Sequence, residues 1–170
     1  TKFHVGSVTK TVLATGVLRL VSQGVIKLDS PVSQYLPQLV FENPWVSDSP
    51  ITVRHLLDHT SGLDDARMWQ LFSTRINPDT PLLVTFTREP DVLRARAHPG
   101  SRFSYSNMGY GLLGLLIESV TGERYESYLD RELLGPLGMH DSSFAFTTPE
   151  GDHADPRLAW GHLDDGSRYG

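Results

Sequence analysis

The sequence predicts a mainly α-helical fold in which any β-sheet is small or lies outside these 170 residues. Apolar residues recur at helical spacing in four substantial segments, whereas at most three weak stretches have the composition of strands. No segment repeats another at a fixed period, which excludes a solenoid. Because 39% of the residues are hydrophobic and 21% are charged, the composition is globular, and we expect residues 1–170 to form a single domain.

The first helix is predicted from Ser7 to about Gln23, because valines and leucines recur there mostly at helical spacing and Gly24 can supply a left-handed stop. Closely spaced prolines follow, and each one removes a backbone donor and restricts the residue before it. Residues 28–49 are therefore expected to be mostly loop, with one helical turn near residues 32–35.

Shorter elements are expected in the middle of the chain. Thr52 can cap a short helix over residues 53–58, and residues 68–73 also have a helical pattern. Residues 82–87 combine β-branched and aromatic side chains, so they fit a strand and the end of a helix about equally well.

Two further helices are predicted in the last third of the chain. A turn at Pro99-Gly100 precedes residues 108–120, which are apolar on most sides and are therefore expected to be buried. A final helix is predicted over residues 125–134, where Gly135-Pro136 ends it.

The overall charge and composition exclude several classes of function. The formal net charge is -5 and no run of like charges occurs, so a nucleic acid is not an expected partner. There is no cysteine to supply a disulfide or a thiolate nucleophile. The longest apolar runs are too short and too interrupted to span a bilayer, and no signal peptide is recognisable in these residues.

Ser7 and Lys10 form the most informative pair in the sequence. A hydroxyl and an amine three residues apart lie on one face of a helix, and a lysine can activate a serine if its surroundings lower its pKa. Ser-x-x-Lys is the signature of penicillin-recognising serine enzymes. The alternative is a serine that caps the helix beside an exposed lysine.

Tyr105-Ser106-Asn107 is a second candidate motif. On a tight loop, a Tyr-x-Asn tripeptide can direct a phenol and an amide at the same point, one to move a proton and the other to hold a carbonyl group or the lysine. The alternative is a half-buried tyrosine beside a turn-forming asparagine.

These motifs occur within longer stretches that follow one another in a fixed order. The stretches are FHVGSVTKT at residues 3–11, ITVRHLLDHTSGL at 51–63, PGSRFSYSNMGY at 99–110 and LLGPLGM at 133–139. Together they resemble the β-lactamase-related serine hydrolase family, which includes class C β-lactamases, penicillin-binding proteins, D,D-peptidases and many esterases. The similarity runs over nearly the whole chain.

The resemblance implies a covalent acyl-enzyme mechanism on an amide, lactam or ester substrate, without a metal or organic cofactor. It makes Ser7 the nucleophile, Lys10 and Tyr105 the groups that transfer the proton, and Asn107 the amide that positions the substrate. Either Lys10 is a neutral base, or it stays charged and favours the phenolate of Tyr105; the sequence leaves both open. Residues 59–63 resemble a loop that supports the site. A periplasmic or extracellular location is compatible with the resemblance.

One motif of the family is not found in the sequence. Family members carry Lys or His, a small residue and Gly on a strand across the cleft, and the strands that precede the nucleophile are also absent here. His98-Pro99-Gly100 has the letters, but its proline lacks the N–H that such a strand would contribute. The chain is therefore expected to be the helical region and nucleophile helix of the α+β fold, truncated at both ends. The remainder of the domain would complete the cleft.

Two other functions fit parts of the sequence. A module that keeps the fold for binding or assembly would explain the missing motif. A metal-dependent hydrolase would use His55 and His59, which are spaced i, i+4, together with Asp58. Against the metal site, Leu56 stands where a metalloprotease has glutamate directly after its first histidine.

Overall fold

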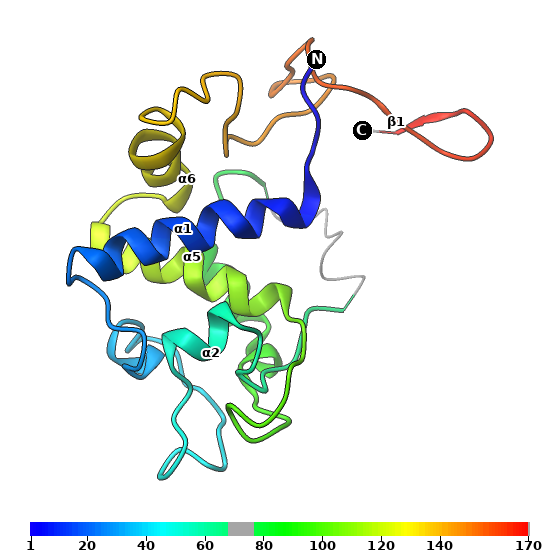
Figure 1. Cartoon of the computed structure of the whole chain (residues 1–170). Helices are drawn as coiled ribbons and strands as arrows, with labels where there is room; N and C mark the ends of the chain where they lie inside the picture. Colours follow the sequence, from blue (N-terminus) through cyan, green and yellow to red (C-terminus); the bar gives the residue numbers. More distant parts are fainter. Residues whose placement is uncertain (68–76, 170) are drawn as a thin grey trace.

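Two helices, α1 (Thr9–Ser22) and α5 (Asn107–Thr121), lie side by side at the centre of the fold (Figure 1). The computed structural model describes residues 1–67 and 77–169. Three further helices pack against α5: α2 (Val53–Leu57), α4 (Leu82–Arg88) and α6 (Tyr125–Leu129). Helix α6 also contacts α1, so the two central helices and α6 share one hydrophobic core.

Short turns and one small hairpin complete the secondary structure of the described residues. The hairpin pairs β1 (Gly161–His162) with β2 (Arg168–Tyr169) in antiparallel register and projects away from the helices (Figure 1). The helical turns are η1 (Gly6–Val8), η2 (Val32–Gln34), η3 (Pro90–Leu93) and the π-helical turn η4 (Asp130–Leu134). Outside the hairpin, residues 1–67 and 77–169 contain only isolated β-bridges, so the prediction of a mainly helical chain without a substantial sheet is confirmed.

Helix α5 is the most buried element, as its apolar sequence predicts. Its buried side chains include Leu112, Leu113, Leu116 and Ile117, all with 0% exposure. The Ser106 hydroxyl caps the first turn by accepting a hydrogen bond from the Gly109 N–H at 3.0 Å. Gly122 ends the helix in a left-handed conformation with φ 75°, which glycine adopts without steric cost.

The contact between α1 and α6 depends on the absence of a side chain at Gly16. A Cβ atom at this position would lie 2.3 Å from Cδ2 of Leu129 and 3.7 Å from side-chain atoms of Ile117 and Leu133. The first distance is far below van der Waals contact, so a side chain at position 16 would force Leu129 to shift.

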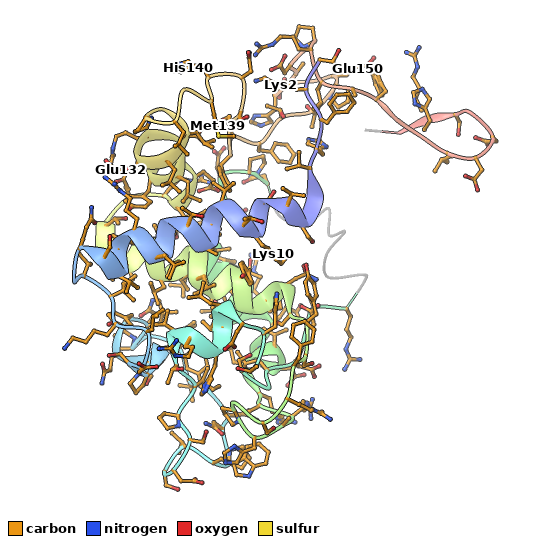
Figure 2. All side chains as sticks on the ribbon, viewed as in Figure 1. Lys2, Lys10, Glu132, Met139, His140 and Glu150 are labelled. Atoms are coloured by element: carbon orange, nitrogen blue, oxygen red, sulfur yellow. The ribbon has the colours of Figure 1, made fainter. Side chains whose placement is uncertain are left out.

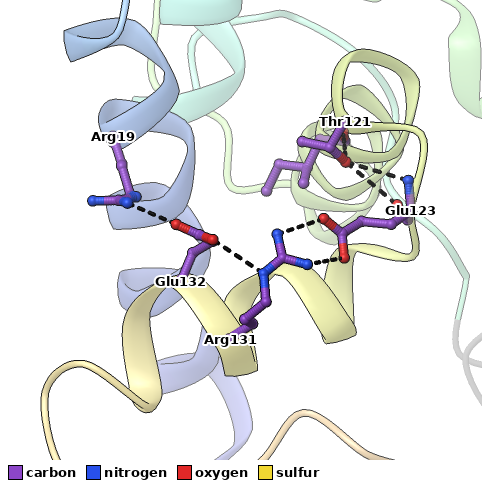
Figure 3. A network of polar contacts seen from close by, with 6 residues as sticks. Arg19, Thr121, Glu123, Arg131 and Glu132 are labelled. Carbon is purple, nitrogen blue, oxygen red and sulfur yellow. Dashed lines mark hydrogen bonds and ion pairs between the residues drawn. The ribbon is translucent and has the colours of Figure 1, made fainter.

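A chain of ion pairs links the ends of these helices on the surface (Figure 3). Arg19 on α1 contacts Glu132 at 2.6 Å, Glu132 contacts Arg131 at 3.0 Å, and Arg131 contacts both carboxylate oxygens of Glu123 at 2.7 Å. Because these groups are exposed, each pair stabilises the fold by only about 0–1 kcal/mol. Their geometry nevertheless connects α1, η4 and the turn that follows α5.

Most predicted elements are found close to their expected positions, and two need comment. Residues 82–88 are helical, which decides between the strand and the helix that the sequence left open. The helix predicted over residues 125–134 consists of α6 and then η4, so its second half is π-helical. The helix predicted over residues 68–73 lies outside the described residues. Among the described residues, no helix is both long and apolar enough to cross a bilayer.

The segment that leads to Ser7 is fastened to a part of the chain that is distant in sequence. The Lys2 N–H donates to the Arg157 carbonyl at 2.7 Å, and the Ala159 N–H donates to the Lys2 carbonyl at 2.8 Å. The Lys2 ammonium also pairs with Asp155 at 3.1 Å. Figure 2 shows Lys2 beside this late segment, before the chain enters α1.

Candidate active site

The structure brings the four candidate residues together at the start of α1 and α5. The Lys10 ammonium donates to Ser7 Oγ at 3.2 Å and to Asn107 Oδ1 at 2.8 Å. The Tyr105 hydroxyl is hydrogen-bonded to Ser7 Oγ at 2.8 Å. Residues almost 100 positions apart in the sequence therefore meet within hydrogen-bonding distance, and Lys10 lies between the two central helices (Figure 2).

The first half of the site is built by the turn that precedes α1. Gly6 has φ 53°, a left-handed conformation that favours glycine, and it starts the turn η1 that contains Ser7. The following helix begins at Thr9, so Lys10 lies one turn beyond Ser7 and its amine reaches back to the serine hydroxyl. Ser7 is exposed and Lys10 is half-buried.

The second half of the site is built by the residues that enter α5. Ser106 is 1% exposed and caps the helix, whereas the side chains on either side of it reach Ser7 or Lys10. Tyr105 precedes the cap in the connecting loop, and Asn107 is the first residue of α5. The Tyr-x-Asn spacing therefore directs Tyr105 and Asn107 at the site, because the side chain of the intervening Ser106 points inward and caps the helix.

The charge of Lys10 favours deprotonation of Tyr105. Its ammonium lies 5.0 Å from the centre of the Tyr105 ring and 5.7 Å from that of Tyr110. The interaction with Lys10, and then the hydrogen bond with Ser7, lower the pKa of Tyr105. Burial instead raises the pKa of Tyr110, whose hydroxyl donates to the Leu57 carbonyl at 2.9 Å. Of these two phenols, Tyr105 is the better suited to accept a proton.

Asp65 is a site residue that the sequence reasoning missed. Its carboxylate accepts hydrogen bonds from the Asn107 N–H at 2.7 Å, the Asn107 side-chain amide at 3.0 Å and the Met108 N–H at 3.1 Å. The interaction fixes the amide of Asn107 so that its oxygen faces Lys10. No local signal identifies Asp65, because its partners are about 40 residues away; its place shortly after the stretch 51–63 is the closest hint.

His59 packs against the loop that carries Tyr105. It has φ 60°, an uncommon conformation for a residue other than glycine, and its Nδ1 accepts a hydrogen bond from the Ser106 N–H at 3.2 Å. Its ring lies 4.5 Å from that of Tyr105 and 5.0 Å from that of Tyr110. Burial, and then the charge of Lys10, lower the pKa of His59, which keeps the ring neutral and able to accept this hydrogen bond.

The alternative in which His55 and His59 pair around a metal is not supported by the structure. Helix α2 ends at Leu57, and the left-handed conformation of His59 places it outside the helical register that the i, i+4 spacing requires. His55 Nδ1 accepts from the Thr52 N–H at 3.3 Å in a capping box, and Asp58 accepts from Thr60. In residues 1–67 and 77–169, no three side chains of the metal-binding types form a group.

The arrangement contains the parts needed for acyl transfer by a serine. An exposed hydroxyl contacts a phenol with a lowered pKa and an ammonium group, and a fixed side-chain amide lies beside them. Such a group of side chains can deprotonate the serine and stabilise the charge that develops on it.

Comparison with known proteins gives an independent view of the chain. Residues 1–168 match the family model described as Beta-lactamase. Among curated proteins, Esterase EstB of Burkholderia gladioli is 34% identical over 161 residues, which cover 88% of this chain and 40% of the esterase. Protein flp of Staphylococcus aureus (strain COL) is 31% identical over 159 residues, which cover 90% of this chain and 30% of that protein.

Solved structures show the same similarity. An octameric penicillin-binding protein homologue from Pyrococcus abyssi superposes with a TM-score of 0.74 at 31% identity, over 96% of this chain and 37% of that chain. EstCE1, a hydrolase with promiscuous acyltransferase activity, superposes with a TM-score of 0.71 at 26% identity, over 98% of this chain and 44% of that chain. The chain thus spans between 30% and 44% of the length of each of these proteins.

Proposed function

Because the chain belongs to the β-lactamase family, in its serine hydrolase group, we propose that it carries the nucleophile half of a site that cleaves an amide, lactam or ester through a covalent acyl-enzyme. One observation carries the proposal: Ser7 Oγ lies within hydrogen-bonding distance of both Lys10 and Tyr105. Packing alone gives no reason for an exposed serine to meet an ammonium group and a phenol together.

In the proposed reaction, Ser7 Oγ attacks the substrate carbonyl carbon while its proton passes to the phenolate of Tyr105. In this reaction Lys10 stays positively charged, and its interaction with Tyr105 stabilises that phenolate by lowering the pKa of Tyr105. The same proton then passes to the leaving amine or alcohol as its bond to the carbonyl carbon breaks. Water attacks the resulting ester, and the acid is released with Ser7 regenerated.

Asn107 is proposed to position the substrate. Its Oδ1 accepts from Lys10 and its side-chain amide donates to Asp65, so its orientation is fixed before any substrate arrives. A carbonyl or amide of the substrate beside Ser7 would meet a group that needs no rearrangement.

For the substrate class, we favour an ester or a peptide-like amide: an esterase or peptidase fits the chain better than an enzyme dedicated to β-lactams. The motifs in this chain are those shared across the family, and the similar proteins include EstB and EstCE1 as well as a D-stereospecific amidohydrolase from Streptomyces that is 31% identical. Neither of the two His-x-Gly triplets in the sequence, at residues 4–6 and 98–100, lies on a strand, so the Lys/His-x-Gly strand of the family is not found among the 170 residues. We therefore propose that further residues of the domain complete the cleft, and that this chain alone turns over substrate slowly or not at all.

Covalent labelling tests the proposal without requiring turnover. The chain is incubated with a fluorophosphonate, and the modified residue is identified by mass spectrometry in three forms: unmodified, Ser7→Ala, and Ser104→Ala as a matched exposed serine nearby. We expect an adduct on Ser7 that is lost only in Ser7→Ala. Equal labelling of Ser7→Ala, or no labelling of any form, would instead favour a non-catalytic module that retains the fold.

A further inference from the structure

A small pocket lies beside the candidate site, and Lys10 is part of its lining. Its volume is about 280 Å³, and it is bounded by residues from α1, α4, α5 and α6. The lining residues used below are Gly6, Lys10, Leu13, Leu82, Tyr110, Gly114 and Tyr125. Pockets that hold a whole drug-sized ligand have roughly 300–1,000 Å³, so this one suits part of a substrate.

The walls of the pocket are apolar. Leu13 and Leu82 contribute aliphatic side chains, and the two tyrosine rings of the lining contribute aromatic surface. The Tyr110 hydroxyl is already bonded to the Leu57 carbonyl, and burial raises the pKa of Tyr125 to about 12, so neither brings a charge. The Lys10 ammonium is directed at Ser7 and Asn107.

Gly114 on α5 keeps the pocket open. A Cβ at Gly114 would lie 3.3 Å from Cδ2 of Leu82 and 3.4 Å from the Tyr125 ring, both of which line the pocket. A methyl group there would therefore press on the two side chains that form the wall.

The pocket also adjoins the nucleophile. Gly6 directly precedes Ser7, and the Lys10 amine is 3.2 Å from Ser7 Oγ, so two lining residues flank the serine. A group attached to a carbonyl at Ser7 could therefore extend into this space.

We propose that the pocket binds the aliphatic acyl chain of the substrate, which makes medium-length acyl esters or amides the preferred class. This inference rests on the proposed function. Each buried methylene contributes about 0.8 kcal/mol, so each added methylene that fits should raise the rate of Ser7 acylation about fourfold, until the pocket is full.

Binding and acylation are tested separately. Binding is followed by NMR on Ser7→Ala, with hexanamide as the probe and acetamide as the short control. We expect hexanamide, and not acetamide, to shift the amide signals of Gly6 and Gly114, and to lose this effect in Gly114→Ala. Leu82→Ala enlarges the pocket without adding strain, and in it the response to octanamide should increase. Leu18→Ala, an exposed change elsewhere on α1, should alter neither response.

Acylation is followed with alkyl fluorophosphonates of increasing chain length on the unmodified chain. A rate that rises with chain length supports the inference, whereas equal rates at all lengths contradict it. If hexanamide shifts no pocket signal in either Ser7→Ala or its Leu82→Ala form, the pocket is not an acyl site even where Ser7 is labelled. If the pocket signals shift while no probe labels Ser7, the pocket binds aliphatic groups and the proposed hydrolase function fails.

Discussion

The Asp65 carboxylate accepts hydrogen bonds from both the backbone N–H of Asn107, at 2.7 Å, and the side-chain amide of Asn107, at 3.0 Å. The same carboxylate accepts the N–H of Met108, so one side chain pairs two N–H groups in the first turn of α5. The orientation of Asn107, and through it the position of Lys10, therefore depends on a residue outside the family motifs quoted above.

Replacing Asp65 with asparagine should reduce the rate of Ser7 labelling by roughly tenfold or more, because the amide of Asn107 loses its fixed acceptor. The negative charge of Asp65 raises the pKa of Tyr105, so its removal should also lower that pKa. The rate should then reach its plateau at a lower pH than in the unmodified chain. A labelling profile measured against pH shows both effects.

Asp64→Asn is the matched control for this change, because Asp64 is the adjacent residue and pairs with Arg96 instead. Asp64→Asn should not change the pH at which the labelling rate reaches its plateau. A uniform loss of labelling in Asp65→Asn, without a displaced profile, would indicate only a damaged fold.

Tyr105→Phe should lower the labelling rate by roughly 10²–10⁴-fold, the usual contribution of a positioned acid or base. In the unmodified chain, the rate should rise with pH as the phenol ionises. It should level off below about pH 10, where an unperturbed tyrosine titrates, because Lys10 lowers the pKa of Tyr105. The measurement is the second-order rate constant from pH 5 to 11, and a Tyr105→Phe variant with an unchanged profile would exclude the phenol as the proton acceptor.

The half-buried histidines His55 and His59 should make the fold less stable in mild acid. Burial lowers the pKa of His55 and of His59, so below the unfolded value of about 6.5 the unfolded chain binds more protons than the folded one. Stability is therefore fully present above that pH and is lost as the pH falls toward the folded pKa values. Thermal unfolding midpoints from pH 8 to 5 should decline, and His55→Gln and His59→Gln should each decline less steeply. Parallel curves for all forms would contradict this assignment.

The close approach of α1 and α6 predicts a measurable coupling between Gly16 and Leu129. Gly16→Ala should destabilise the fold by about 1–3 kcal/mol through overpacking, and Leu129→Ala by about 2–5 kcal/mol through loss of buried contacts. The double variant should be more stable than the sum of these losses, because the shortened side chain makes room for the new methyl group. Urea unfolding of the four forms gives the coupling, and simple additivity would show that the two positions do not compete for space.

Local signals predicted most of the helical framework. The spacing of valines and leucines with Gly24 gives α1, and the continuous apolar run gives α5. Thr52 caps α2 as expected, since its hydroxyl accepts from the His55 N–H at 3.3 Å. These features depend on residues within a few positions of one another, so a sequence is enough to predict them.

Other features depend on contacts that no local pattern encodes. Helix α4 has one buried residue, Phe86, so its seven residues carry no decisive periodicity and only packing against α5 selects the helix. The i, i+4 spacing of His55 and His59 was misleading because the chain leaves the helix before the second histidine. The motifs predicted Ser7 and Tyr105 as candidate site residues, whereas the contacts of Asp65 become visible only when residues 42 positions apart meet in the fold.

The contacts of Lys2 with residues 155–159 restrain the segment that leads to Ser7, the candidate nucleophile. The short segment from Lys2 to Ser7 is held at one end by these hydrogen bonds and the ion pair of Lys2, and at the other end by the turn η1. A change of structure near Asp155 is therefore expected to shift Ser7 through the five residues of backbone that follow Lys2, although more than 140 positions separate Asp155 and Ser7 in the chain.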